Sequence, residues 1–125
     1  MKSLKLPKNE RGSKIKQPIL SKGVGKPATS YSRELMVSIP QGTLVDIETT
    51  GLDSNYDEIV VFGYVQGNRL EIICRTSKEE DPFIAQLAEL VSKLPKPFYA
   101  YNLSFEKGFL KAKGMNIEGI DLFQP

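Results

Sequence analysis

The chain has 125 residues, of which 40% are hydrophobic and 26% are charged, and this length allows one domain at most. Cys74 is the only cysteine and histidine is absent, so an internal disulfide framework and a Cys/His zinc cluster are both excluded. The sequence contains no signal-peptide core and no apolar run of membrane-spanning length, so we expect a cytoplasmic protein that does not associate with membranes.

Positive charge is concentrated near the N-terminus. Residues 1–39 contain nine Lys or Arg residues and two acidic residues, whereas acidic residues outnumber basic ones in the remainder. Residues 1–30 mix Lys, Gly, Ser and Pro without a helical or alternating period, so we predict a mostly disordered arm. Residues 31–39 look extended and are predicted to add an edge strand before Pro40. A basic arm suits contact with nucleic-acid phosphates, although a solvated tail has the same composition.

A pattern of short strands begins at Gly42 and opens a domain over 40–125. Thr43–Ile47 is an apolar run that predicts a strand buried on both faces. Two further strands are predicted over 58–65 and 69–76, joined by the hairpin-type sequence at 66–68.

The strand predicted over 69–76 has an alternating pattern. Leu70, Ile72 and Cys74 alternate with Glu71 and Arg75, which favours the first three as the core-facing side chains. Ile73 interrupts the alternation, which indicates partial burial of the second face.

Two helices are predicted in the second half of the domain. An apolar stripe at helical spacing runs from Asp81 to Leu94, where Pro95 and Pro97 end it. A strand over 98–102 follows, parallel to the first strand through this helical crossover. Ser104 is predicted to cap a second helix that ends near Lys113, and a further strand is expected over 117–123. The order β-β-β-α-β-α-(β) predicts a mixed α/β sheet.

Two carboxylates lie one residue apart on the first strand of this domain. Asp46 and Glu48 project to the same face because side chains on a strand alternate. Inside a sheet they would repel each other and be costly to desolvate, and a divalent cation would offset both costs. Their hard oxygen donors suit Mg²⁺ or Mn²⁺. If the strand frays at Asp46, both acids are simply solvated.

The segment Val45-Asp46-Ile47-Glu48-Thr49-Thr50-Gly51-Leu52 resembles the first motif of the RNase H-like DEDD 3′-5′ exonuclease superfamily. That family's second motif, Asn-x-x-Phe-Asp, is similar to the segment from Asn102 to Glu106, where Glu106 replaces Asp. The resemblance covers about residues 40–123 and implies a partial RNase H-like exonuclease domain, truncated before the family's last helix. The third motif, a Tyr or His followed by Asp on that helix, has no match.

The resemblance implies a role for each matching residue. Asp46 would bridge two metal ions about 4 Å apart, Glu48 would hold the ion that polarises the attacking water, and Glu106 would ligate the second ion. Substrate contacts would come from Thr49, Gly51, Leu52 and Asn102. The extra methylene of Glu106, relative to Asp, would alter the metal geometry.

Three functions are compatible with these residues. The chain is part of a nuclease whose fourth carboxylate and general base come from elsewhere, or it is a catalytically inactive module that binds DNA or RNA, or a second chain or domain completes its site. The first interpretation implies a metal-dependent phosphodiesterase. Loss of a ligand and a base typically lowers the rate by several orders of magnitude, so we expect weak activity from the chain alone.

Overall fold

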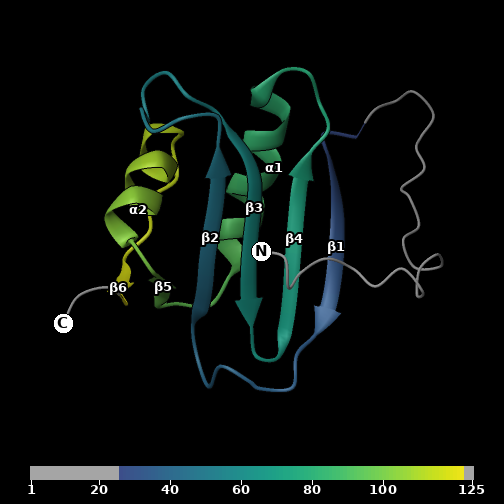
Figure 1. Cartoon of the computed structure of the whole chain (residues 1–125), viewed down its shortest axis with the longest axis vertical. Coiled ribbons are helices and arrows are strands. Elements are labelled where there is room, and N and C mark those ends of the chain that lie inside the picture. Colours follow the sequence, from purple (N-terminus) through teal and green to yellow (C-terminus); the bar gives the residue numbers. More distant parts are fainter. Residues whose placement is uncertain (1–25, 123–125) are drawn as a thin grey trace.

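The computed structural model describes residues 26–122, which form one six-stranded sheet with two helices (Figure 1). In spatial order the strands are β1 (Ala28–Glu34), β4 (Arg69–Arg75), β3 (Ile59–Gln66), β2 (Thr43–Thr49), β5 (Phe98–Ala100) and β6 (Gly119–Asp121). The first four are antiparallel neighbours, and β5 and β6 continue parallel to β2. The predicted mixed α/β sheet and the order of its elements are confirmed.

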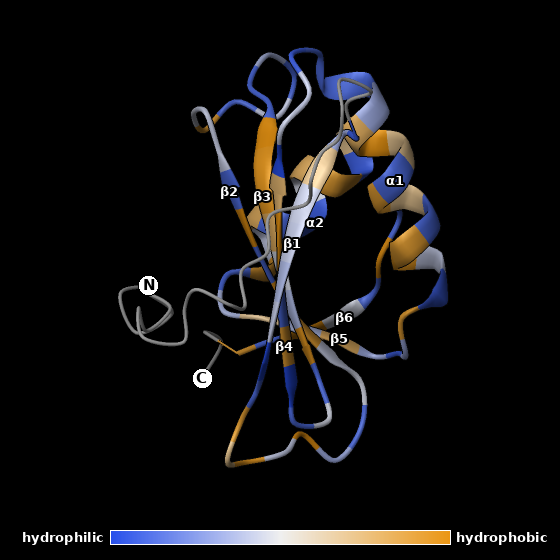
Figure 2. Cartoon of the chain, turned by 90° about the vertical axis from the view of Figure 1, so that its right-hand side faces the viewer, coloured by the Kyte–Doolittle hydropathy of each residue, from blue (hydrophilic) through white to orange (hydrophobic). Residues whose placement is uncertain are grey.

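Both helices lie on the same face of the sheet. Helix α1 (Glu80–Lys93) connects β4 to β5, and helix α2 (Leu103–Ala112) connects β5 to β6. Both crossovers join parallel strands and advance in the same direction across the sheet, and crossovers of this kind are right-handed, so the two helices must cover one face. Figure 2 shows α1 in alternating orange and blue, as expected for a helix with one apolar side. Its buried residues are Phe83, Leu87 and Val91, on the predicted stripe.

The hydrophobic core fills the space between the helices and this face of the sheet. Val45 and Ile47 on β2 are 2% and 5% exposed, and Phe62 on β3 is fully buried. Asp46 and Glu48, which alternate with them on β2, are exposed. The prediction that β2 is buried on both faces is therefore wrong, because no described helix covers the second face.

The side chains of β4 lie on the opposite faces of the sheet from those predicted. Ile73 is 5% exposed and belongs to the core, whereas Leu70, Ile72 and Cys74 are only half-buried on the uncovered face. The alternation was read correctly, but its apolar side faces away from the helices. Sequence periodicity indicates which residues share a face without indicating which face a helix covers.

Several element boundaries differ from the predictions. The edge strand exists but runs from Ala28 to Glu34, so residues 28–30 belong to the sheet and residues 35–39 do not. The disorder predicted for residues 1–25 lies outside the described residues. Asn102, and not Ser104, occupies the N-cap position of α2, and its side chain makes no capping hydrogen bond. The predicted start of α1 near Asp81 and its end before Pro95 are confirmed within one residue.

Candidate active site

The candidate site is centred on β2, the strand next to the parallel half of the sheet. Asp46 and Glu48 lie on the uncovered face because they alternate with the buried Val45 and Ile47. Gly63 on β3 is the register partner of Asp46, so no neighbouring side chain on that strand covers this carboxylate. The two acids therefore remain open to solvent at the middle of the sheet.

An apolar groove adjoins these two acids. It has a volume of about 430 Å³, and its floor comes from β2, β3 and β4. Tyr101, at the junction between β5 and α2, lines the same groove as Asp46 and Glu48. The groove is lined by Leu44, Val45, Asp46, Glu48, Val61, Gly63, Tyr64, Val65, Leu70, Ile72 and Tyr101.

Helix α2 brings a third carboxylate to the strand. Glu106 is 4% exposed, and its Oε1 atom is buried without a hydrogen-bond partner. The pKa of Glu106 is raised to about 7, chiefly by burial, and the charge of the Asp46 carboxylate and a side-chain hydrogen bond to it contribute to this rise. The backbone N–H groups of Glu106 and Ile47 act in the opposite direction. Two carboxyl groups from distant parts of the sequence thus meet at one point.

This pair fits a divalent cation. A buried carboxylate oxygen without a partner is costly, and a second carboxylate beside it increases the cost of ionisation. A cation that prefers oxygen ligands would relieve both penalties. Asp46 and Glu106 are thus the residues best placed to hold Mg²⁺ or Mn²⁺.

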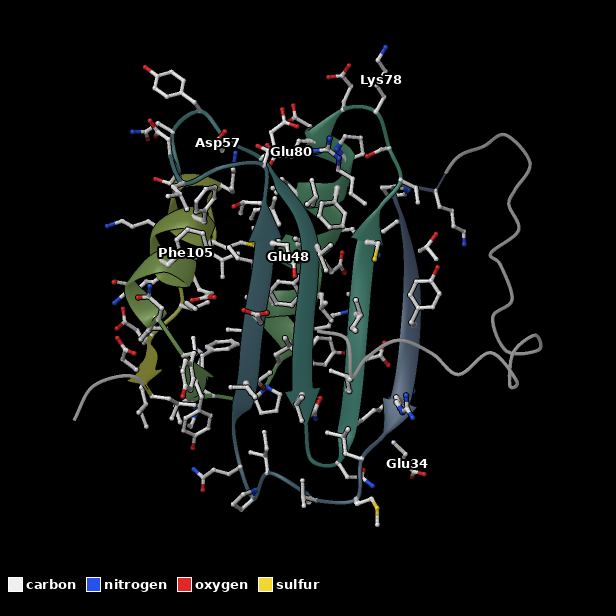
Figure 3. The ribbon with its side chains drawn as sticks, viewed as in Figure 1. Glu34, Glu48, Asp57, Lys78, Glu80 and Phe105 are labelled. Carbon is white, nitrogen blue, oxygen red and sulfur yellow. The ribbon has the colours of Figure 1, made fainter. Side chains whose placement is uncertain are left out.

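Glu48 shares the exposed face with Asp46, and its charge contributes to the raised pKa of Cys74 on β4, after the larger effect of burial. Figure 3 labels Glu48 on β2 at the middle of the sheet. Within residues 26–122 there is no group of three or more His, Cys, Asp or Glu side chains arranged to hold a metal ion. The structure therefore joins Asp46 to Glu106 and leaves Glu48 as a neighbour on the same face.

Residues 50–58 form an ordered loop at the carboxyl end of β2. Thr49 Oγ1 donates to the Gly51 carbonyl oxygen at 2.6 Å, and Asp53 N–H donates to Asp57 Oδ2 at 2.8 Å. A Cβ atom on Gly51 would lie 2.5 Å from Asp57 Oδ2. A side chain at position 51 would therefore require the Asp57 carboxylate to move, which is a local reason for glycine that does not depend on substrate. Leu52 is 86% exposed at the loop surface.

Asn102 directly precedes helix α2 and follows Tyr101, which lines the groove. It is exposed at the start of α2, and its Oδ1 atom accepts a weak hydrogen bond of 3.4 Å from Ser104 Oγ. Its side chain is thus available to a ligand near Tyr101. Sequence reasoning did not single out Tyr101 or Asp57, because neither carries a local pattern that distinguishes it from an ordinary surface residue.

Comparison with protein families gives one match. A family model for the RNase H superfamily matches residues 43–125, about two thirds of the chain. The chain belongs to the RNase H superfamily. Neither the curated proteins nor the solved structures yielded a match. The matched region begins at β2, so it contains the sheet strand that carries Asp46 and the helix that carries Glu106.

Family membership indicates a nuclease-type function. RNase H-like domains act on nucleic acids, and nucleases of this superfamily generally use divalent metal ions. The RNase H-like fold expected from the sequence is confirmed. In the described part of the chain no helix is both long and apolar enough to span a membrane.

Proposed function

We propose that this RNase H-like domain is a metal-dependent nuclease of the DEDD 3′-5′ exonuclease type that hydrolyses phosphodiester bonds in DNA or RNA. The observation that carries the proposal is the meeting of Asp46 with the buried, unsatisfied carboxyl group of Glu106. A bound Mg²⁺ or Mn²⁺ would supply charge stabilisation and an activated water molecule at neutral pH.

The protein's own residues would bind and orient the reacting groups. Asp46 and Glu106 hold the cation, and Glu48 extends the carboxylate surface along β2 toward the substrate. The 3′-terminal nucleotide of the bound DNA or RNA contacts Thr49, Gly51, Leu52 and Asn102. The Lys and Arg residues of the N-terminal arm attract phosphate without reading sequence. We place this chemistry in the cytoplasm.

One observation favours a second candidate function. Asp46 and Glu106 meet, but among residues 26–122 no third His, Cys, Asp or Glu side chain joins them in a group arranged to hold a metal ion. The chain alone would then bind nucleic acid with little turnover. A second chain or domain placed over the groove would supply the missing carboxylate and general base, and the groove beside Asp46 has room for such a segment.

The decisive experiment is degradation of 5′-labelled single-stranded DNA and RNA in Mn²⁺. We expect a ladder of products shortened from the 3′ end, abolished by Asp46→Asn and by Glu106→Gln. Glu89→Gln is the matched control, because Glu89 is an exposed acid on α1 with no part in the site. Products of internal cleavage would contradict the exonuclease assignment. No cleavage by the wild-type chain, together with retained binding that weakens with salt, would favour the binding module instead.

A further inference from the structure

The loop over 50–58 holds two large side chains in solvent on a rigid backbone. Leu52 and Tyr56 are 86% and 83% exposed. The backbone beneath them is fixed by hydrogen bonds from Tyr56 N–H and Asp57 N–H to the Asp53 carbonyl oxygen, 3.1 and 2.7 Å long. Thr50 closes the loop, since its N–H donates to the Glu58 carbonyl oxygen. An exposed apolar residue is ordinary by itself, but exposure on a loop this well ordered points to a contact surface.

A half-buried lysine ties this loop to the body of the domain. Lys113 Nζ donates to the Asp57 carbonyl oxygen and to Glu80 Oε1, each at 3.0 Å. Glu80 Oε2 in turn accepts from Ile59 N–H at 2.8 Å, at the point where β3 begins. The side chains of Lys113 and Glu80 are only 15% and 11% exposed. The loop is therefore held against both helices and cannot swing freely.

The loop lies close to the carboxylate pair along the chain and in space. It follows directly from β2, and Asp46 precedes the end of that strand by three residues, about 10 Å at the rise of a strand. Figure 3 labels Asp57 above β2, on the side of the sheet where α2 lies. A nucleic-acid strand that ends at Asp46 and Glu106 would reach this loop within a few nucleotides.

The chemistry of the loop favours a base over a phosphate. Its two aspartates are already engaged within the loop, since Asp53 Oδ1 accepts from Asn55 N–H and Asp57 accepts from Asp53 N–H. These carboxylates repel a phosphate group, whereas an exposed tyrosine ring offers a flat apolar surface. Stacking on an aromatic ring requires no particular base, because every base has a π-face.

We propose that Tyr56 stacks against an unpaired base of the nucleic acid whose 3′ end is bound at Asp46 and Glu106. The proposal rests on the proposed function for its ligand class, single-stranded nucleic acid. Tyr56 is a specificity-determining contact for single strands, since a base held in a duplex has no free face to offer.

The test uses fluorescence anisotropy with the full chain in Ca²⁺, a cation that takes oxygen ligands. The probes are oligothymidylates that carry one abasic nucleotide, moved one position at a time from the 3′ end. For the wild type we expect one position at which base removal weakens binding about tenfold. Tyr56→Ala is expected to weaken binding of the intact strand by the same factor and to be insensitive to the abasic nucleotide at that position. Tyr56→Phe, which keeps the ring, is expected to restore both properties.

Met36→Ala is the matched control, because Met36 is 98% exposed after β1 and its removal leaves the loop untouched. Equal affinities for wild type and Tyr56→Ala, or an abasic profile that Tyr56→Ala does not flatten, would overturn the proposal, as would the absence of wild-type binding. The proposed function is judged separately, by Mn²⁺-dependent degradation. Cleavage without a Tyr56 effect leaves the nuclease and removes the stacking contact. An abasic profile that depends on Tyr56, without cleavage, would support the stacking contact and contradict the proposed nuclease function.

Discussion

Both faces of the sheet carry apolar side chains, but the two faces differ in what covers them. On the helix-covered face Ile73 and Phe62 are nearly or fully excluded from water, whereas on the other face Ile72 and its neighbours line an open groove beside Asp46. The covered face stabilises the fold. The open face combines partial burial with carboxylates, a combination that favours binding over stability.

The largest expected effect separates these faces with a pair of identical substitutions. Ile73→Ala removes a core side chain and should lower the free energy of unfolding by about 4 kcal/mol. Ile72→Ala, one residue earlier on β4, should cost about 1 kcal/mol, because the Ile72 side chain is only half-buried and lines the open groove. Urea denaturation of both variants measures the difference. Equal losses would mean that another part of the protein covers the groove in solution.

Glu106 gives the next largest effect and links the faces, since it comes from α2 and meets Asp46. Its raised pKa means that the folded state retains a proton that the unfolded state releases near pH 4.5. Stability is therefore fully present at lower pH and falls as the pH rises toward about 7, by up to about 3 kcal/mol. Glu106→Gln, which is neutral throughout, should be more stable than wild type at pH 8 and lack this pH dependence.

Addition of Mn²⁺ provides the control for this stability difference between the wild type and Glu106→Gln. In chemical denaturation at pH 8, Mn²⁺ should stabilise the wild type, because a ligand that binds only the folded state shifts the unfolding equilibrium. It should have little effect on Glu106→Gln, which lacks the second carboxylate. If Glu106→Gln is less stable than the wild type at pH 8, the ionised Glu106 carboxyl group does not destabilise the folded protein at that pH.

The sequence predicted the elements better than their surroundings. Helix α1 and the strands from β2 to β4 were predictable because their periodicity is local. Asp46, Glu48 and Glu106 were identified as candidate site residues because they lie in segments that resemble family motifs. The orientation of Ile72 and Ile73 was not, since alternation looks the same whichever face the helices cover. The cap of α2 was misassigned because Asn102 and Ser104 are both common cap residues.

Contacts across the fold were beyond local reasoning for a further reason. The hydrogen bond from Lys113 to Asp57 joins residues 56 positions apart, and no spacing rule connects them. The same holds for the approach of Glu106 to Asp46, which depends on how the β5–α2 unit lies against β2. Motifs therefore identify candidate site residues, whereas packing determines how many of them meet.

The smallest expected effect compares two ion pairs, one between the helices and one on the surface of α1. Lys113→Met leaves the Glu80 carboxylate partly buried without its cation and should lower stability by about 2 kcal/mol, with Glu80→Gln restoring part of the loss in the double variant. Lys93→Met removes the exposed partner of Glu89, both side chains being 70% exposed, and should change stability by less than about 0.5 kcal/mol.

A double-mutant cycle for each pair, followed by urea denaturation at low and high salt, measures the coupling. Because the Lys113 pair is shielded from solvent, its coupling should survive high salt, whereas any coupling at Lys93 should vanish. Equal couplings that salt abolishes in both pairs would mean that Lys113 does not hold the loop over 50–58 in place.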